Sequence, residues 1–176
     1  GCVLASRLAN KSKDSICLVE AGGSGKNLFI KMPAGNGFIF GNPKFDWGYH
    51  SVKQAQLNNR KIYFARGKGL GGTSIVNGMV YIRGVAQDYD NWRQMGLDGW
   101  GYSDLLPYFK YSEGSTNRQN KFHGNQGPLK VEPARNFSVL DEAFIKAAVD
   151  TGHEFLDDFN ANKRAGVSRI DSTTYR

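Results

Sequence analysis

The chain has 176 residues, of which 40% are hydrophobic and 22% charged, and this ordinary globular composition argues against wholesale disorder. No apolar run approaches the roughly 18 residues that span a membrane, so we expect no transmembrane segment. A formal net charge of +7 admits a nucleic-acid-binding domain, but the cations are scattered and no groove-reading motif accompanies them, so we expect a basic surface and no nucleic-acid partner.

The first predicted element is a helix over residues 1–10. Leu4 and Leu8 stand four residues apart among good helix formers, so we expect one face of this helix to pack inward. The two cysteines, Cys2 and Cys17, lie in apolar settings that favour small buried side chains. Neither has CxxC or metal-ligand spacing, so we expect no metal site.

A short apolar run, Ile16–Val19, follows a polar turn and is typical of a parallel strand buried on both faces. It ends in Glu20, where a dinucleotide-binding βαβ unit places the acid that binds ribose hydroxyls. The spacing back to Gly1 fits if Gly1 is the last glycine of GxGxxG, with the first strand and the earlier glycines upstream of this chain. A carboxylate favours FAD or NAD over NADP. The alternative is that Glu20 merely ends a strand.

Residues 24–60 lack sustained periodicity and predict long ordered loops with short elements. A short strand is expected over 61–65, and a strand or extended segment over 79–83. Further along the chain, Ser103 is placed to cap a helix over roughly 104–112.

The last third of the chain begins with a polar stretch, 114–120, that predicts a linker or loop. Alternation over 129–132 indicates a half-buried strand. Ser138 caps an amphipathic helix whose apolar residues follow helical spacing, and Gly152 ends it.

The most informative segment is the glycine run over residues 67–78. Its glycines allow the backbone to press against a flat or anionic ligand, and its polar side chains put hydrogen-bonding groups on the same surface. The order GxxxxGK[ST] of a phosphate-binding P-loop is absent. From these residues alone, a glycine-rich turn without a ligand stays open. The glycines are Gly67, Gly69, Gly71, Gly72 and Gly78, and the polar residues are Thr73, Ser74 and Asn77.

This run resembles the first signature of the glucose–methanol–choline (GMC) oxidoreductases, in which a glycine pair, two small or hydroxyl residues, an apolar residue and Asn precede an aromatic, a Gly and an acid. Here the pattern reads Gly71-Gly72, Thr73-Ser74, Val76, Asn77, Tyr81, Gly84 and Asp90. Nearly the whole chain is similar to the family in the same order. Further matching segments are 1–8, 18–22, 88–92, 99–102, 106–109, 122–124 and 127–129.

The resemblance implies an α/β fold, α+β overall, with an incomplete Rossmann-like FAD-binding βαβ core. It implies a partial FAD-binding domain over 1–113 and the start of a substrate-binding domain over 114–176. Some members attach FAD covalently through a His just before the signature Asn; here Val76 stands there, which favours non-covalent FAD. The FAD-binding residues that the resemblance implies are Gly1, Glu20, Gly72, Thr73, Asn77, Gly78 and Val80.

The implied activity is oxidation of a small-molecule alcohol, with hydride transfer to the flavin and reoxidation by O₂ or another acceptor. The alternative is an FAD-binding relative without redox activity, such as a lyase or a binding protein. The family's catalytic His pair lies near the carboxyl end of a chain about three times longer. His50, His123 and His153 do not match that pair, so we expect no catalytic residue in this chain and no turnover by it alone.

The aromatic side chains Trp47 and Tyr81 are candidates to line a flavin or substrate cavity, although core packing is the commoner explanation for such residues. The sequence does not name the alcohol, the electron acceptor or the cellular compartment.

Overall fold

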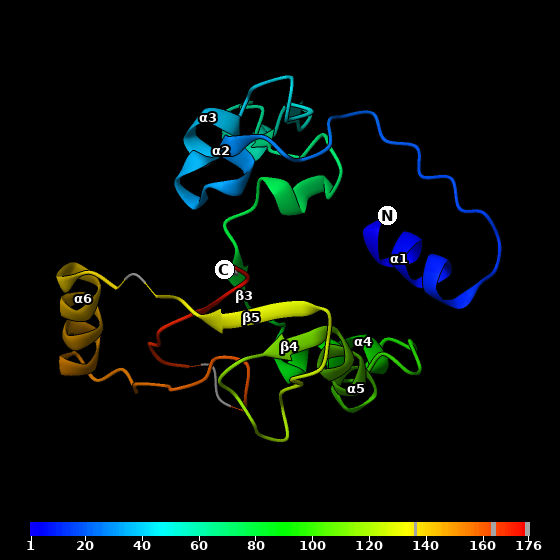
Figure 1. The fold of residues 1–176 in the computed structure, drawn as a ribbon. Coiled ribbons are helices and arrows are strands. Elements are labelled where there is room, and N and C mark those ends of the chain that lie inside the picture. Colours follow the sequence, from blue (N-terminus) through cyan, green and yellow to red (C-terminus); the bar gives the residue numbers. More distant parts are fainter. Residues whose placement is uncertain (136, 163–164, 175–176) are drawn as a thin grey trace. The chain divides into compact units, whose positions relative to one another are not determined.

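The computed structural model describes residues 1–135, 137–162 and 165–174 (Figure 1). The chain forms two compact units, Gly1–Gly78 and Met79–Arg176. The division predicted between residues 113 and 114 concerns the domains of the family fold and stays a prediction. In the described part of the chain, none of the helices is both long enough and apolar enough to cross a bilayer.

The first unit contains short helices and a small apolar core. Helix α1 spans Cys2–Lys11, α2 spans Leu28–Lys31 and α3 spans Asn36–Ile39, with 3₁₀ turns η1 over Pro33–Gly35, η2 over Ala55–Leu57 and η3 over Gly72–Ile75. Strands β1 (Tyr49–His50) and β2 (Tyr63–Phe64) pair antiparallel as a hairpin. The core is formed by Ile39, Phe45 and Val76, against which Ile30 and Ile75 pack.

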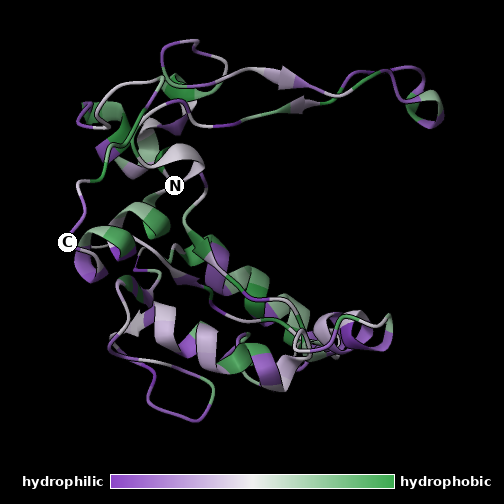
Figure 2. Ribbon diagram, turned by 90° about the vertical axis from the view of Figure 1, so that its right-hand side faces the viewer, coloured by the Kyte–Doolittle hydropathy of each residue, from purple (hydrophilic) through white to green (hydrophobic). Residues whose placement is uncertain are grey.

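The second unit contains a four-stranded sheet in the order β3-β6-β5-β4. These strands are β3 (Val80–Tyr81), β4 (Glu113–Ser115), β5 (Leu129–Pro133) and β6 (Asp171–Ser172), and its helices are α4 (Ala86–Gln94), α5 (Tyr102–Ser112) and α6 (Val139–Asp150). Strands β4 and β5 pair parallel, whereas β6 pairs antiparallel with both β3 and β5. Apolar and polar residues occur together on the same helices (Figure 2).

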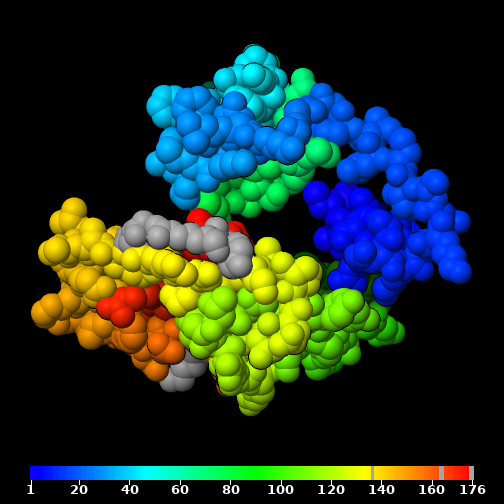
Figure 3. All heavy atoms as spheres, in the orientation of Figure 1, coloured from blue at the N-terminus to red at the C-terminus, as the bar shows by residue number. Residues whose placement is uncertain are grey.

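The buried strand predicted over Ile16–Val19 is wrong for this structure. The segment is extended but unpaired among the described residues, and the exposed fraction of Val19 is 89%. A parallel strand is buried only when neighbouring strands flank it and crossover helices cover its faces, and the described residues supply neither to the segment. Figure 3 shows the blue stretch after α1 as a single line of residues.

Helix α1 forms as predicted, but its apolar face is not buried. Leu4 and Leu8 are 67% and 50% exposed, and none of the residues of α1 is buried. The predicted burial of Cys2 and Cys17 is wrong as well, since both are free and exposed. Helical spacing determines the face on which side chains lie, but only a packing neighbour removes them from water.

Local signals in the second half of the chain are confirmed with shifted boundaries. Ser138 caps α6 by accepting a hydrogen bond from the Asp141 amide, and Gly152 follows the helix at a φ of 97°. Helix α5 begins earlier than predicted: Gly101 is its cap and Ser103 lies inside its first turn. The predicted polar linker is partly wrong, because its first two residues belong to the buried strand β4.

Candidate cofactor site

In the first unit, the segment that carries Glu20 packs directly on the glycine run. Gly23 forms a parallel bridge with Gly69, and the Leu70 amide donates to the Gly23 carbonyl at 2.9 Å. A Cβ on Gly22 would lie 2.3 Å from the carbonyl carbon of Lys68, so the two backbones touch without room for a side chain. The structure therefore brings together two segments that the sequence separates by more than forty positions.

Glu20 itself is exposed, and its carboxylate accepts a hydrogen bond from the Gly22 amide at 2.8 Å. This short local bond holds the carboxylate at the point where the segment meets the glycine run. A carboxylate oxygen has several acceptor positions, so the bond to Gly22 leaves others for a ligand hydroxyl.

The glycine run folds back on itself for the same steric reason. A Cβ on Gly67 would lie 2.1 Å from the Gly72 carbonyl oxygen. Gly71 and Gly72 have φ values of 110° and 57°, a left-handed region that side chains other than glycine rarely enter. These two residues lead into the 3₁₀ turn η3.

The turn η3 and the residues that follow it have an apolar side and a polar side. Val76, only 2% exposed, packs into the core, while Thr73, Asn77 and Gly78 are exposed. The Asn36 side-chain amide donates to the Asn77 carbonyl oxygen at 3.1 Å and ties the loop to α3. Burial of one side chain thus presents a polar, glycine-rich surface to a ligand.

A buried carboxylate that the sequence analysis missed holds the start of this run. Asp46 is 2% exposed and accepts hydrogen bonds from the amides of Gly41, Gly48 and Arg66 and from the Tyr63 hydroxyl. Burial acts to raise the pKa of this carboxyl, but the four hydrogen bonds outweigh it and hold the pKa well below its usual range. Asp46 is therefore an ionised anchor for the loop.

Replacement of Asp46 by asparagine is expected to destabilise the first unit by about 1–3 kcal/mol, because charge-assisted hydrogen bonds weaken and one side-chain N–H₂ faces other donors. The pKa of Asp46 in the folded protein lies below the ordinary value of 3.8, so the stabilisation by Asp46 is complete above that pH and is lost as the pH falls below it. Urea unfolding at pH 7 and at acidic pH measures both effects. Asp98→Asn, at an exposed position, is the control; equal stability of the two variants would contradict the anchor.

A second feature missed from the sequence is a cavity of about 220 Å³ beside the same backbone contact. Its wall includes three lysines, Lys26, Lys44 and Lys68, that lie far apart in the sequence. No carboxylate belongs to its lining as far as the chain is described. The cavity is electropositive and suits an anionic group.

The remaining predicted site residues are Gly1 and Val80. Gly1 caps α1, and a Cβ there would meet no atom within 4 Å, so Gly1 stands clear of the glycine run. Val80 belongs to β3 in the second unit and is half exposed. The roles assigned to both stay predictions.

The aromatic candidates take local partners. Trp47 is 44% exposed, stacks on Tyr49 with ring centroids 6.0 Å apart, and lies under the Lys68 ammonium group. Tyr81 is partly buried, and its hydroxyl accepts a hydrogen bond from Arg83 Nε at 3.2 Å. The predicted role of Trp47 and Tyr81 in lining a flavin or substrate cavity stays a prediction.

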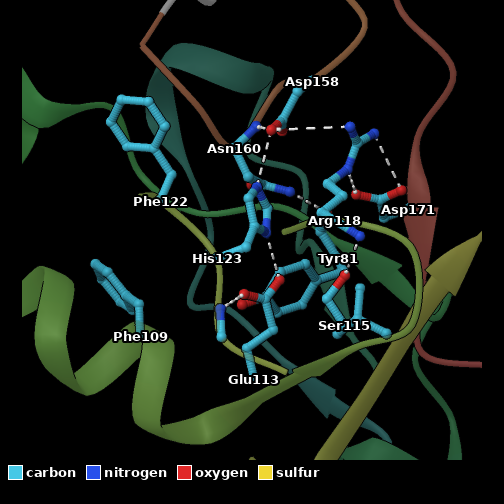
Figure 4. A network of polar contacts seen from close by, with 12 residues as sticks. Tyr81, Phe109, Glu113, Ser115, Arg118, Phe122, His123, Asp158, Asn160 and Asp171 are labelled. Carbon is cyan, nitrogen blue, oxygen red and sulfur yellow. Dashed lines mark hydrogen bonds and ion pairs between the residues drawn. The ribbon is translucent and has the colours of Figure 1, made fainter. Parts of the chain in front are cut away.

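The three histidines occupy different settings. His50 and His153 are exposed, and His50 Nδ1 lies 2.9 Å from the Gly48 carbonyl oxygen. His123 is buried in the second unit between the carboxylates of Glu113 and Asp158 (Figure 4). With both ring nitrogens engaged by carboxylates, His123 has no free nitrogen with which to act as a base on a substrate.

Comparisons with known proteins place these features in a family. Residues 14–176 match the family model described as GMC oxidoreductase. The chain is 42% identical over its whole length to an oxygen-dependent choline dehydrogenase from Sinorhizobium fredii, of which it covers 32%. It thus spans about a third of the length of the curated relatives it matches.

Solved structures share the fold. Pyridoxine 4-oxidase from Mesorbium loti superposes with a TM-score of 0.89 at 31% identity, over 98% of this chain and 34% of the other. An FAD-dependent oxidoreductase from Chaetomium thermophilum superposes with a TM-score of 0.82 at 29% identity, over 98% and 31% respectively. The predicted α/β class, with an incomplete FAD-binding fold, is confirmed by these matches.

Proposed function

The chain belongs to the GMC oxidoreductase family, and from this premise we propose that it forms the FAD-binding amino-terminal part of a flavoprotein that oxidises the CH–OH group of a small-molecule alcohol. The observation that supports the proposal best is the contact between the Glu20 segment and the glycine run, which share a backbone interface without room for a Cβ at Gly22. An extended dinucleotide needs both a ribose acid and a close backbone surface, and this contact joins them.

The residues of the first unit fit such a ligand in chemical character. The exposed carboxylate of Glu20 suits the adenosine ribose hydroxyls. The lysine-lined cavity beside it suits the charge of the pyrophosphate. The exposed residues Thr73, Asn77 and Gly78 offer hydrogen-bonding groups to a flat polar ring. We assign this last surface to the flavin end.

We propose that FAD is held without a covalent bond. The residue before Asn77 is Val76, whose side chain is apolar and packed into the core. It has no nucleophilic atom, and its burial turns it away from the exposed surface of the loop. Binding would then depend on hydrogen bonds and charge alone.

When bound, the flavin would accept a hydride from the alcohol carbon, while the protein supplies position and electrostatics. The residues here bind and orient the cofactor. We place the base that takes the alcohol proton outside this chain, because His123 lies between two carboxylates and neither His50 nor His153 matches the catalytic pair of the family.

The experiment that tests this function uses the full-length protein. It is expected to purify with the visible absorbance of flavin, to release that flavin on acid denaturation, and to bleach anaerobically with an alcohol. Choline and pyridoxine are the first substrates to test, because matched proteins carry those names. Flavin that stays on the denatured protein would contradict non-covalent binding, and flavin that no alcohol reduces would favour the relative without redox activity.

Replacement of Glu20 by glutamine is expected to weaken FAD binding about tenfold or more, because a hydrogen bond to a charged acceptor contributes about 1.5–3 kcal/mol. Titration of apoprotein with FAD, followed by flavin fluorescence, measures the dissociation constant. Glu142→Gln, an exposed position in the second unit, is the matched control. An unchanged dissociation constant for Glu20→Gln would mean that Glu20 does not bind FAD.

A further inference from the structure

The motif Phe122-His123-Gly124 has no role in the proposed function, yet it forms the centre of a buried polar cluster (Figure 4). The His123 side chain is fully buried; its Nδ1 lies 2.8 Å from Glu113 Oε1 and its Nε2 lies 2.8 Å from Asp158 Oδ2. A Cβ on Gly124 would lie 1.9 Å from the Lys110 carbonyl oxygen, so this glycine lets the loop lie against the end of α5.

Two routes of contact lead from His123 to the segment of β3. On one side, Glu113 Oε2 accepts from Arg83 Nη2 at 2.8 Å. On the other side, Asp158 Oδ1 accepts a hydrogen bond from the backbone amide of Asn160 at 2.7 Å. The Asn160 side chain then bonds the backbone of the β3 segment. It accepts from the Arg83 amide at 2.9 Å and donates to the Tyr81 carbonyl at 3.3 Å.

These contacts form a closed ring through His123, Glu113, Arg83, Asn160 and Asp158. The ring fixes the backbone from Tyr81 to Arg83, immediately after Val80. Breaking the ring at His123 would loosen both routes at once, because its two nitrogens serve one carboxylate each.

The charges of the cluster balance only if His123 carries a proton. Its buried or mostly buried cations and anions are Arg83, Arg118 and protonated His123 against Glu113, Asp158 and Asp171. A neutral imidazole would turn one lone pair toward a carboxylate and leave an unpaired negative charge inside the unit, which is costly.

Several elements around His123 contribute titratable or charged groups. Glu113 comes from the start of β4, Arg83 and Tyr81 from the segment of β3, and Asp158 from the loop before β6. Arg118 precedes His123 in the same loop, bonded to Asp171 of β6 at 2.7 Å and paired at 3.4 Å with the exposed Asp157.

Burial acts to lower the pKa of His123, but its hydrogen bonds to Asp158 and Glu113 and their charges raise it to about 9. The same contacts, together with the Asn160 amide, outweigh burial at Asp158 and lower its pKa to about 2. Burial raises the pKa of the Tyr81 hydroxyl above its usual 10.0. Tyr81 therefore stays neutral while His123 loses its proton.

Resting on the proposed function, we infer that His123 is a positioning residue: as a buried imidazolium between Glu113 and Asp158, it holds the β3 segment in place. This segment carries Val80, which the family resemblance predicts to contact the flavin. The contacts with Glu113 and Asp158 hold this segment while His123 is charged, and they weaken when His123 loses its proton. Since the folded pKa lies above the ordinary 6.5, the contribution is complete below that pH and is lost as the pH rises through about 9.

The first test needs no cofactor. In the chain at pH 7, ¹⁵N NMR of the imidazoles is expected to show both His123 nitrogens protonated. Hydrogen exchange of the amides of residues 79–83 is expected to speed up about tenfold or more in His123→Gln and, in the wild type, as the pH passes 9, after correction for intrinsic exchange. His153→Gln, at an exposed histidine of the same unit, is the control and is expected to match the wild type.

A double variant distinguishes a contribution of His123 through charge balance from a contribution through packing alone. His123→Gln leaves one negative charge in excess, and His123→Gln/Asp158→Asn removes it. The double variant is expected to recover a large part of the lost protection over residues 79–83, although it lacks two native side chains. A double variant that is worse than His123→Gln would overturn the charge argument.

A measurement of FAD binding then tests whether the His123 contacts affect the cofactor site. In the full-length protein, the FAD dissociation constant is expected to rise about tenfold in His123→Gln at pH 7.5, and its rise between pH 7 and 9.5 is expected to flatten in that variant. A neutral His123 at pH 7, or unchanged exchange over 79–83, would overturn the inference even if FAD binds. Absence of FAD from the wild type would instead overturn the proposed function.

Discussion

Replacement of Gly22 by alanine is expected to abolish tight FAD binding and to destabilise the first unit by about 3 kcal/mol, the upper end for overpacking. The added Cβ would lie 2.3 Å from both the carbonyl carbon and the oxygen of Lys68 and 2.5 Å from the Gly69 amide nitrogen. All three contacts are backbone atoms, so no side chain can rotate away. The Glu20 segment and the glycine run must separate, and the bond from Leu70 to Gly23 is lost.

The adjacent glycine offers a matched control. A Cβ on Gly23 would meet no atom within 4 Å, and the backbone there does not require a positive φ. Gly23→Ala is therefore expected to retain the stability of the wild type and serves as the control for unfolding. Urea unfolding measures both variants, and FAD titration compares Gly22→Ala with the wild type. If Gly22→Ala binds FAD as the wild type does, the backbone contact is not part of the cofactor site.

Replacement of Glu113 by glutamine is expected to destabilise the second unit by about 3–5 kcal/mol, the cost of breaking a buried ion pair on one side. Glu113 is fully buried, and its carboxylate accepts from Arg83, His123 and the Gly124 amide, each at 2.8 Å. A glutamine supplies one acceptor oxygen in place of two and turns an N–H₂ group toward a donor. The Arg83 guanidinium then stays buried without its counter-charge.

Urea unfolding with hydrogen exchange resolved by segment is expected to place the Glu113 effect within residues 79–174. The control is Glu142→Gln, the same chemical change at a half-exposed carboxylate that pairs with Arg169 on the surface. Such exposed pairs contribute little because water screens them. If both variants lost a comparable free energy of unfolding, the buried ring would not be the main stabilising contact of the second unit.

The local features of this protein were predictable because a few neighbouring residues determine them. The hydroxyl of Ser138 bonds an amide three positions later, and Gly152 takes a left-handed conformation at the helix end. The crowded glycine run was visible for the same reason: Gly71 and Gly72 adopt backbone angles that other residues avoid. Family membership followed from the order of such local motifs along the chain.

The tertiary structure decided what depends on partners distant in the sequence. The apolar run Ile16–Val19 has strand composition, but burial needs neighbouring strands, and in the described chain none pairs with it. No local pattern marks Asp46 as a buried anchor, because its partners extend to Arg66, twenty residues away. A histidine in a loop likewise becomes a buried cation only when Glu113 and Asp158 converge on it. The sequence by itself thus determined the family, the helix caps and the glycine cradle, which rest on local backbone chemistry. Only the tertiary structure decided which polar groups are buried, because burial and charge pairing arise where distant segments meet.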